Sequence, residues 1–219
     1  MKYDENRKAR ILIVDDHPIV RQGMAMLINL EPELQVCCEA GDITQAIAAS
    51  RSCELDMSIL DMSLGGVSGL ELVKNFRAEF PGMFILMMSM HDEAVYAEPA
   101  LQAGAHGYLM KQVATDTMLK AIRQVLAGEL YVSDQMRSRM LQKMTRGQKE
   151  NSPVSSLTTA EFEVLHLTGM GLGTSEIATK LNRSVKTIET HRANIKHKLN
   201  LKSGSELVHF AIKLVSSTV

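Results

Sequence analysis

The 219-residue sequence has few cysteines, no long apolar stretch and almost no net charge. Its three cysteines, Cys37, Cys38 and Cys53, match neither a disulfide framework nor a zinc-binding pattern, which favours a reducing cytoplasm. The longest apolar runs, residues 11–14 and 83–88, are far shorter than the roughly 20 residues that span a bilayer. Because the first nine residues are polar and charged, neither membrane insertion nor export is expected.

The small net charge of −1 arises because two opposite excesses cancel. Residues 1–130 carry a net charge of −7, whereas residues 131–152 and residues 153–219 carry +3 each. An acidic part followed by a basic part predicts two modules with different partners, and the basic module is a candidate for binding a polyanion. With 45% hydrophobic and 22% charged residues, the composition is typical of a soluble globular protein and excludes wholesale disorder.

Short apolar runs alternate with amphipathic stretches of helical length between residues 10 and 127. Runs that are apolar on both faces suit parallel strands buried between helices. The pattern therefore predicts a doubly wound, flavodoxin-like α/β domain over residues 9–128. In its first helical stretch, Val20, Met24, Leu27 and Leu30 recur at spacings of three and four and predict a helix with one apolar stripe. The five predicted parallel strands are residues 11–14, 34–37, 57–60, 84–88 and 107–110.

The strand pattern stops after residue 128. Residues 129–153 are interpreted as a linker, in which residues 134–145 form a basic helix with Met136, Met140 and Leu141 on one side. A flexible hinge rich in Gly, Ser, Lys, Asn and Pro is predicted over residues 145–156. Residues 154–219 then predict a small all-α domain of four short helices, broken at residues 169–173, 182–183 and 201–204.

Chemically reactive side chains stand where the predicted strands end. Asp15 and Asp16 follow the first run, Asp61 the third, Ser89 ends the fourth and Lys111 follows the fifth. Because ligands of parallel sheets bind outside the carboxyl ends of the strands, we expect these groups to share one crevice. Clustered carboxylates repel one another unless a cation intervenes, and Mg²⁺ with oxygen ligands is the usual solution.

This set of residues suits phosphoryl transfer. A carboxylate such as Asp61 can attack phosphorus and form an aspartyl-phosphate. Mg²⁺ and Lys111 would supply the positive charge that the equatorial oxygens need, and Ser89 could donate a hydrogen bond to one of them. Taken singly, an acidic pair also fits a solvated loop and a lysine fits any surface. Suitable chemistry at four of five strand ends favours a phosphoryl site.

Residues 10–127 resemble the receiver domain of bacterial two-component response regulators. The resemblance implies that Asp61 is the phospho-acceptor, that Asp15 and Asp16 bind the metal, and that the Ser63 carbonyl is a further Mg²⁺ ligand. It also implies that Ser89 and Tyr108 are switch residues and that Lys111 contacts the phosphate. The matching motifs are Val14-Asp15-Asp16-His17-Pro18, Leu60-Asp61-Met62-Ser63-Leu64, Met88-Ser89 and Gly107-Tyr108-Leu109-Met110-Lys111.

Gly65-Gly66 departs from the family pattern, which commonly has proline four residues after the acceptor. Glycine frees the backbone that proline restricts, so we expect a more mobile loop before phosphorylation and altered kinetics. Phosphorylation would add roughly −1.5 to −2 charge at Asp61 and draw Ser89 inward. The surface expected to change comprises residues 92–102, the fifth strand and residues 115–127.

A basic helix is predicted from residue 185 to residue 200, with Ser184 as its N-cap. A short helix at residues 174–181 precedes it, and the two predict a helix-turn-helix whose second helix enters the major groove. A solvated amphipathic helix in a generic bundle remains an alternative at this net charge. The predicted buried stripe is Val185, Ile188, Ile195 and Leu199. The opposite face comprises Lys186, Glu189, Thr190, Ala193 and His197, with Arg192, Lys196 and Lys198 at its margins.

Residues 155–215 resemble the LuxR-type DNA-binding domain of NarL/FixJ regulators. The matching residues are Leu157, Thr158, Glu161, Glu163, Val164, Leu165, Gly171, Glu176, Ile177, Ala178, Leu181, Ser184, Lys186, Thr187, Ile188, His191, Ile195, Lys198 and Leu199. The resemblance implies a recognition helix over residues 184–200, with Glu189, Thr190 and Ala193 nearest the bases. The DNA contacts implied are Lys186, Thr187, Glu189, Thr190, Arg192, Ala193, Lys196, His197 and Lys198.

Three cations that are common in this family are replaced here, by Ala160, Ser175 and Gly204. Each lost phosphate contact lowers DNA affinity, so binding by one subunit is expected to be weak. We therefore expect a homodimer on paired half-sites. The linker residues expected to help are Arg137, Arg139, Lys143, Arg146 and Lys149.

The sequence thus predicts a cytoplasmic response regulator that is not an enzyme. A histidine kinase would phosphorylate Asp61 with Mg²⁺, and the regulator would then bind promoter DNA. One alternative is a Mg²⁺-dependent phosphohydrolase, but Met62 and Ser63 offer no general acid beside the nucleophile. Another is a phosphorylation-independent DNA-binding protein whose receiver-like domain serves only as a dimerisation platform.

Overall fold

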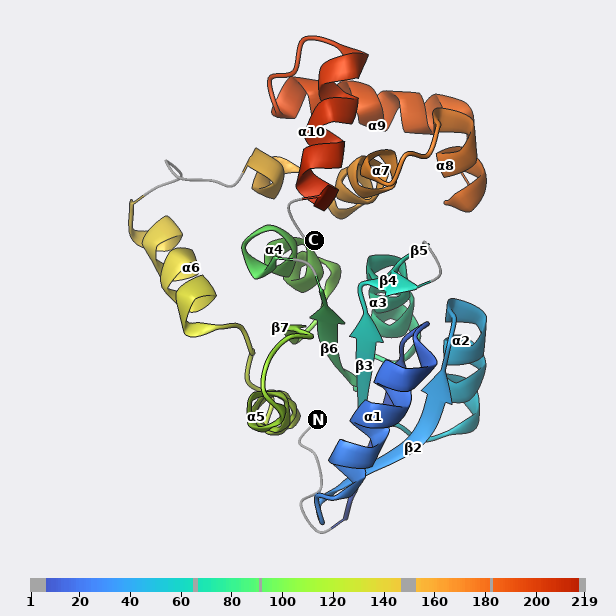
Figure 1. The fold of residues 1–219 in the computed structure, drawn as a ribbon, viewed down its shortest axis with the longest axis vertical. Helices are drawn as coiled ribbons and strands as arrows, with labels where there is room; N and C mark the ends of the chain where they lie inside the picture. Colours follow the sequence, from blue (N-terminus) through green and yellow to red (C-terminus); the bar gives the residue numbers. More distant parts are fainter. Residues whose placement is uncertain (1–6, 65–66, 91, 147–152, 182, 217–219) are drawn as a thin grey trace. The chain divides into compact units, whose positions relative to one another are not determined.

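The computed structural model describes residues 7–64, 67–90, 92–146, 153–181 and 183–216 (Figure 1). Contacts divide the chain into two compact units. The first unit comprises Met1–Glu93 with Ala100–Asp134, and the second comprises Ala94–Pro99 with Gln135–Val219. No helix in the described ranges combines the length and the apolar character that crossing a membrane requires.

A five-stranded parallel sheet forms the centre of the first unit. Its strands pair in the order β2-β1-β3-β6-β7, which confirms the predicted doubly wound α/β architecture. β1, β3 and β6 carry almost continuous buried apolar side chains, as strands covered on both faces must. The five strands are β1 Ala9–Val14, β2 Leu34–Ala40, β3 Met57–Asp61, β6 Phe84–Ser89 and β7 Gly107–Met110.

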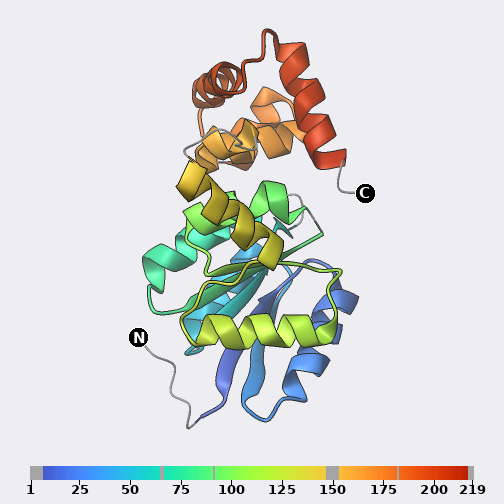
Figure 2. The same cartoon turned by 90° about the vertical axis from the view of Figure 1, so that its left-hand side faces the viewer.

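Helices cover both faces of this sheet (Figures 1 and 2). α1 (Pro18–Asn29) and α5 (Thr115–Leu126) share one core cluster with Ile11 and Ile13 of β1. α2 (Ile43–Ser52) contacts β1 and β2, and α3 (Gly69–Glu79) contacts β3. α4 spans Glu93–Ala103, between β6 and β7 in the chain. In Figure 2, α5 (yellow-green) is seen along its full length on one face of the sheet.

The apolar stripe predicted for the first helix differs from the face that the helix buries. Only Met24 of the four predicted residues is buried, whereas Val20, Leu27 and Leu30 are 37%, 38% and 77% exposed. Met24, Ala25 and Ile28 make up the buried face instead. The reason is that apolar residues occupy nearly the whole circumference of α1, so spacing alone fits more than one face.

β2 is longer than predicted and contains a bulge. Its pairing with β1 passes from Ile11 with Val36 directly to Leu12 with Cys38, which leaves Cys37 as the extra residue. Two short antiparallel strands, β4 (Ser63–Leu64) and β5 (Val67–Ser68), were not predicted. The loop prediction for Gly65-Gly66 lies outside the described residues.

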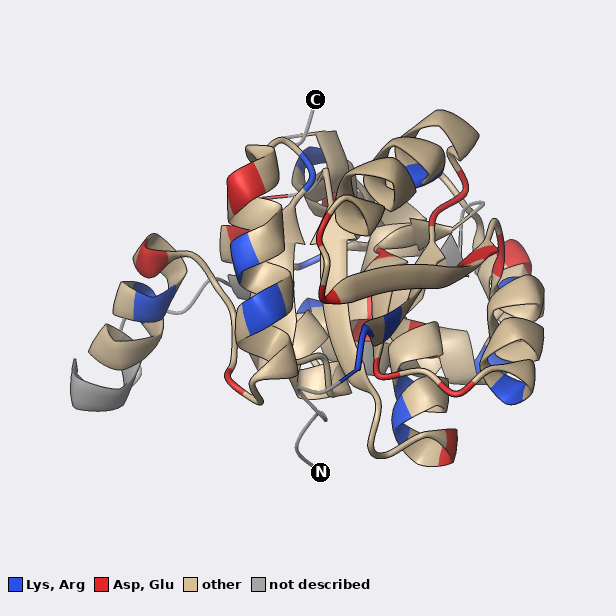
Figure 3. Ribbon diagram, turned by 90° about the horizontal axis from the view of Figure 1, so that it is seen from below, with Lys and Arg blue, Asp and Glu red and all other residues tan. Residues whose placement is uncertain are grey.

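The charge of the first unit is spread over its surface. In the view of Figure 3, Lys and Arg are interspersed with Asp and Glu on the helices. Many of them are paired: Arg51 lies 2.6 Å from Glu79, and Arg123 lies 2.6 Å from Glu33. These pairs are exposed, so each contributes little to stability. The buried charges are the ones that need a functional explanation.

The described part of the second unit contains helices and the segments that connect them, and no strand. Four of them, α7 to α10, match the four predicted after residue 157, and Phe162, Ile177 and Ile195 lie in their core. Gly169 ends α7 where a side chain would collide with the carbonyl oxygen of Ala211 in α10, so glycine permits these helices to approach. The elements are α6 Asp134–Arg146, the 3-10 turn η1 Pro153–Ser156, α7 Thr159–Gly169, α8 Thr174–Lys180, α9 Val185–Lys198 and α10 Gly204–Ser216.

The linker is described only in part. The predicted basic helix is α6, with Met136 buried and Leu141 57% exposed. Residues 147–152 of the predicted hinge lie outside the described residues, as do the side chains of Lys143 and Arg146.

Candidate phosphoryl-transfer site and nucleic-acid interface

The sheet order brings the predicted acidic crevice together. Asp15 follows β1, Asp61 ends β3, Ser89 ends β6 and Lys111 follows β7, and these four strands are neighbours in the sheet. Because the strands are parallel, all four residues lie at the same edge. As expected, Asp15, Asp61 and Lys111 share one crevice, because Lys111 contacts both aspartates directly.

Lys111 joins two buried carboxylates. Its Nζ lies 2.7 Å from Asp15 Oδ2 and 2.7 Å from Asp61 Oδ2. The side chains of Lys111, Asp15 and Asp61 are only 8%, 1% and 5% exposed. The backbone N–H of Lys111 donates to the Ser89 carbonyl at 2.7 Å, which fixes the start of the segment after β7. One ammonium group thus faces two carboxylates with little water to screen them.

Burial sets the protonation behaviour of this pair. Burial raises the pKa of Asp61 above its ordinary value, and Asp15 raises it further, while hydrogen bonding to Lys111 acts in the opposite direction. Burial by itself would lower the pKa of Lys111, but its bonds to Asp15 and Asp61 outweigh burial and raise that pKa. The site therefore holds more negative charge than one lysine compensates, and a further cation would relieve it.

Asp16 and His17 complete a group of potential metal ligands. Ligand atoms of Asp15, Asp16, His17 and Asp61 all lie within 4.8 Å of one another. His17 Nδ1 lies 2.7 Å from Asp16 Oδ1, and the backbone N–H of His17 donates to Asp15 Oδ1 at 2.8 Å. Carboxylate oxygens are the ligands that Mg²⁺ prefers, so the donor set fits this ion. His17 was given no role from the sequence, although its position directly after Asp15 and Asp16 could have indicated a further ligand.

The remaining predicted site residues come from the segment after β3 and from the strands β6 and β7. Ser63 donates a backbone hydrogen bond to the Asp61 carboxylate. Ser89 and Tyr108 are fully buried. Gly69, which sequence reasoning missed, starts α3 so close to Asp61 that any Cβ would collide with the Asp61 carbonyl oxygen. The backbone around Asp61 is thus tightly enclosed.

A short helix, a turn and a longer helix are present in the second unit as predicted. Ser184 caps α9, because its Oγ accepts the backbone N–H of Thr187 at 3.1 Å. Ile188 and Ile195 of α9 are buried, and Leu199 after it is half-buried. The prediction for Val185 is wrong: it is 44% exposed, because packing of α9 begins one turn later at Ile188.

The outer face of α9 carries the predicted polar and basic residues. Lys186, Glu189 and Thr190 near its start are exposed, and the Thr190 hydroxyl donates to the Lys186 carbonyl at 2.9 Å. The face thus presents side chains at the helical spacing that groove recognition needs. Of the other predicted contacts, Ala193, His197 and Lys198 are exposed, and Thr187, Arg192 and Lys196 are half-buried.

Lys198 has a structural partner. Its Nζ lies 2.6 Å from Oε2 of Glu161, a buried residue in the first turn of α7. Glu161 also accepts the backbone N–H of Thr158 at 2.7 Å in a capping box. Burial would raise the pKa of Glu161, but Lys198 and Thr158 outweigh it and hold that pKa below its ordinary value. The ammonium of Lys198 therefore anchors α9 to α7.

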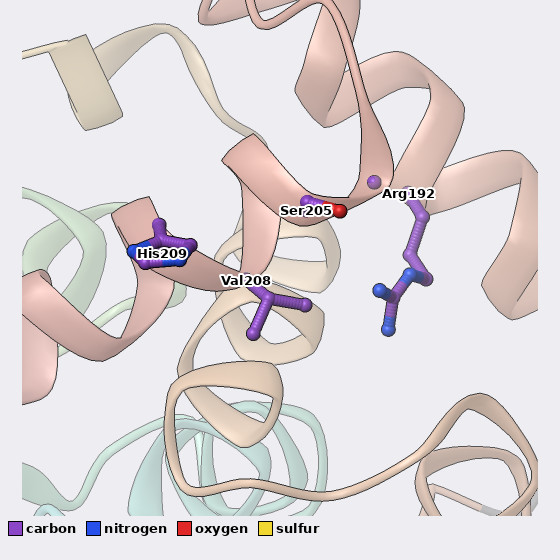
Figure 4. Close-up of a pocket in the computed structure, with 5 residues that line it drawn as sticks. Arg192, Ser205, Val208 and His209 are labelled. Atoms are coloured by element: carbon purple, nitrogen blue, oxygen red, sulfur yellow. The ribbon is translucent and has the colours of Figure 1, made fainter.

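Arg192 borders a shallow pocket of about 530 Å³ between α9 and α10 (Figure 4). Figure 4 shows the guanidinium of Arg192 on one side and Val208 and His209 of α10 on the other. Gly204, one of the positions without the cation common in the family, also lines the pocket. The pocket lies at the margin of the exposed α9 face, beyond its central residues.

A parallel α/β unit with an acidic crevice, followed by a helix-turn-helix unit, is typical of response regulators that bind DNA. A model for the response regulator receiver domain matches residues 11–123, and a model for the luxR family of bacterial regulatory proteins matches residues 155–211. The oxygen regulatory protein NreC of Staphylococcus carnosus (strain TM300) is 36% identical over 210 residues, which cover 93% of this chain and 97% of that protein. NreC of Staphylococcus haemolyticus (strain JCSC1435) is 35% identical with the same coverage.

Solved structures agree with this likeness. RcsB from Salmonella enterica serovar Typhimurium, bound to promoter rprA with the phosphomimetic BeF3−, superimposes with a TM-score of 0.77 at 28% identity, covering 94% of this chain and 99% of RcsB. A structure of two RcsB dimers bound to two parallel DNAs gives a TM-score of 0.72 at 28% identity, covering 94% of this chain and 99% of that one. The chain belongs to the NarL/FixJ family of two-component response regulators.

Proposed function

We propose that Asp61 accepts a phosphoryl group from a histidine kinase and that this modification controls DNA binding by α9. The observation that carries the proposal is the position of Lys111, 2.7 Å from both Asp15 and Asp61. This position supports the proposal, because a cation beside both carboxylates would supply positive charge to the phosphoryl oxygens.

Residues of this chain account for each part of the transfer. Asp61 would attack phosphorus with a carboxylate oxygen, forming an O–P bond as the N–P bond to the donor histidine breaks. Lys111 would then exchange its contact with Asp61 for one with a phosphoryl oxygen. Mg²⁺ bound by Asp15, Asp16, Asp61 and the Ser63 carbonyl would neutralise charge on the phosphoryl oxygens.

Ser89 and Tyr108 would convert the modification into a change of surface. Both are fully buried, and Asp61 is only 5% exposed, so a new negative group at Asp61 would lie in a setting of low dielectric constant. Ser89 would donate its hydroxyl to the phosphoryl group and move inward. Tyr108 would follow into the vacated space, altering the surface near β7, α4 and α5.

DNA binding is proposed for the exposed face of α9, with its start directed into the major groove. RcsB, whose structures are similar over both domains, is bound to promoter DNA, and RcsB dimers are bound to DNA. These likenesses support a dimer on paired half-sites here. Lys186 and Arg192 would grip phosphates, and Glu189 and Thr190 would reach base edges.

The phosphohydrolase alternative has less support. It would need a general acid beside Asp61. The next residue, Met62, is apolar and only 1% exposed, and Ser63 carries a hydroxyl group instead of a carboxyl group. We therefore propose that the phosphorylated form is a signalling state and not an intermediate in the turnover of a small substrate. No observation on the described residues favours a platform that is independent of phosphorylation.

Phos-tag electrophoresis after treatment with acetyl phosphate and Mg²⁺ tests the acceptor. The wild type should yield a retarded band, and Asp61→Asn should yield none. Asp116→Asn, which alters an exposed aspartate on α5, is the matched control and should behave as the wild type. Retardation of Asp61→Asn to the wild-type extent would refute the assignment.

A further inference from the structure

Two of the three cysteines, Cys38 and Cys53, meet where the edge strand β2 and the end of α2 come together. Cys38 lies in β2, and Cys53 directly follows α2, with its backbone N–H bonded to the Ala49 carbonyl. The Cys38 thiol donates to Cys53 Sγ at 2.8 Å. Non-bonded carbon atoms pack at about 3.5–4.0 Å, and sulfur is larger than carbon, so these sulfurs are unusually close.

The bulge in β2 creates this meeting. Ile11 and Val36 are register partners on the sheet face covered by α1 and α5. Without an extra residue, Cys38 would point to that same face, because every second side chain of a strand does. With Cys37 as the extra residue, Cys38 pairs with Leu12 and turns to the opposite face, where α2 contacts β2. Figure 1 shows α2 alongside β2.

Both thiols are within reach of small oxidants. Cys38 and Cys53 are half-buried, and β2 is an edge strand of the sheet that the described residues form. The sulfurs must approach by about 0.8 Å to reach the disulfide bond length of about 2.05 Å. A metal site is a weaker explanation for the close approach of the two sulfurs. Among the described residues, the side chains that cluster in threes or more as potential metal ligands do not include a cysteine.

We propose that Cys38 and Cys53 form a reversible intramolecular disulfide when the protein meets a hydroperoxide such as hydrogen peroxide. The product closes a loop across α2 and ties the edge strand to the start of the segment that leads into β3. Dithiol reductants reopen it. Cys37, which donates instead to the Ile11 carbonyl at 3.6 Å, is left outside the bond.

The oxidation balances in two steps. The Cys53 sulfur attacks one peroxide oxygen, an S–O bond forms, the O–O bond breaks, and the second oxygen leaves as water with the thiol proton. The Cys38 sulfur then attacks the sulfenic sulfur of Cys53, an S–S bond forms, and the hydroxyl leaves as water with the Cys38 proton. In total, two thiols lose two electrons to one peroxide. Burial, followed by the bond to Cys53, raises the pKa of Cys38 to about 12, so Cys38 keeps its proton until the second step.

The disulfide would restrain the end of β2 that lies near the acidic crevice. Two residues beyond Cys38, the carbonyl of Ala40 accepts the backbone N–H of Asp15 at 3.1 Å. A covalent link at Cys38 restrains this end of β2 and reduces the entropy of the unfolded chain. We therefore expect oxidation to raise the melting temperature of the receiver domain by roughly 5–10 °C.

Peptide mapping of the full-length protein tests the proposal. Trypsin cleaves after Arg51 and so separates Cys38 and Cys53 into peptides 22–51 and 52–74. After exposure to equimolar hydrogen peroxide and alkylation, the two peptides should be linked in the wild type and in Cys37→Ser, the matched control. They should separate with dithiothreitol and should not be linked in Cys38→Ser or Cys53→Ser.

Thermal melts of the wild type alone give a readout that needs no variant. Peroxide should raise the melting temperature, and dithiothreitol should reverse the rise. The proposal is overturned if the cysteines pass to sulfinic acid without linked peptides, or if Cys38→Ser links as fully as the wild type. Links only between two copies of the chain would overturn it as well.

Discussion

Lys111 and Lys186 are both lysines of proposed functional surfaces, yet their surroundings differ completely. Lys111 is 8% exposed and lies between two carboxylates that are 1% and 5% exposed, whereas Lys186 stands exposed on α9. Buried charges depend strongly on one another, because little water replaces a lost partner. Exposed charges are screened and act almost independently. The phosphoryl site should therefore respond to substitution as a unit, and the α9 face residue by residue.

Removing the ammonium of Lys111 should have the largest effect. Lys111→Ala leaves Asp15 and Asp61 buried without their counter-charge, which should lower the free energy of unfolding by about 3–5 kcal/mol in the absence of Mg²⁺. Mg²⁺ should restore part of this loss. Urea unfolding with and without Mg²⁺ measures both, and Lys120→Ala, at an exposed position on α5, is the control. Equal free energies of unfolding for the two variants would contradict the claim that buried charges depend more strongly on their partners than exposed ones.

An intermediate effect is expected at Glu161, whose buried carboxylate pairs with the partly exposed Lys198. Glu161→Gln should lower the stability of the DNA-binding domain by about 1–2 kcal/mol at neutral pH. Because the folded protein holds the pKa of Glu161 below its ordinary value of 4.5, this contribution is complete above that value and is lost as pH falls through the folded pKa. Wild type and variant should therefore converge in acid unfolding followed by circular dichroism. A constant gap down to the lowest pH would contradict the assigned role.

The smallest effect on stability is expected on the exposed face of α9. Lys186→Ala should change the free energy of unfolding by no more than about 0.5 kcal/mol. It should weaken binding to a short fluorescent duplex of mixed sequence and reduce the log–log salt slope by about 0.9. Anisotropy titrations over a range of salt concentrations measure this. Lys213→Ala, which removes an exposed lysine from α10, should leave the slope unchanged, and an equal loss in both variants would remove α9 from the interface.

The predictions from sequence succeeded where local chemistry and strand order decide the outcome. The apolar runs predicted the strands of the sheet. Asp15, Asp61 and Lys111 at the ends of these runs predicted the crevice, because parallel strands place their carboxyl ends at the same edge. Ser184 was identified as a cap for an equally local reason: its hydroxyl accepts a backbone N–H three residues later.

The failures share a different cause. The apolar stripe predicted for α1 does not match its buried face, because most residues of α1 are apolar and packing against the sheet selects Ala25 and Ile28. The bulge at Cys37, and with it the meeting of Cys38 and Cys53, depends on register with β1 and leaves no local pattern. The pair of Lys198 with Glu161 joins residues that are 37 positions apart. Such contacts follow from tertiary packing, which periodicity does not report.

Direct chemical mapping of the phosphorylated residue is the most decisive measurement. Borohydride reduces an acyl phosphate to an alcohol, so wild-type protein phosphorylated with Mg²⁺ and then reduced should carry homoserine at the modified aspartate. Tandem mass spectrometry of tryptic peptide 52–74 should place homoserine at Asp61 and leave Asp56 in the same peptide intact. Homoserine at Asp15 or Asp16, or phosphorylated protein with an unaltered Asp61, would contradict the account.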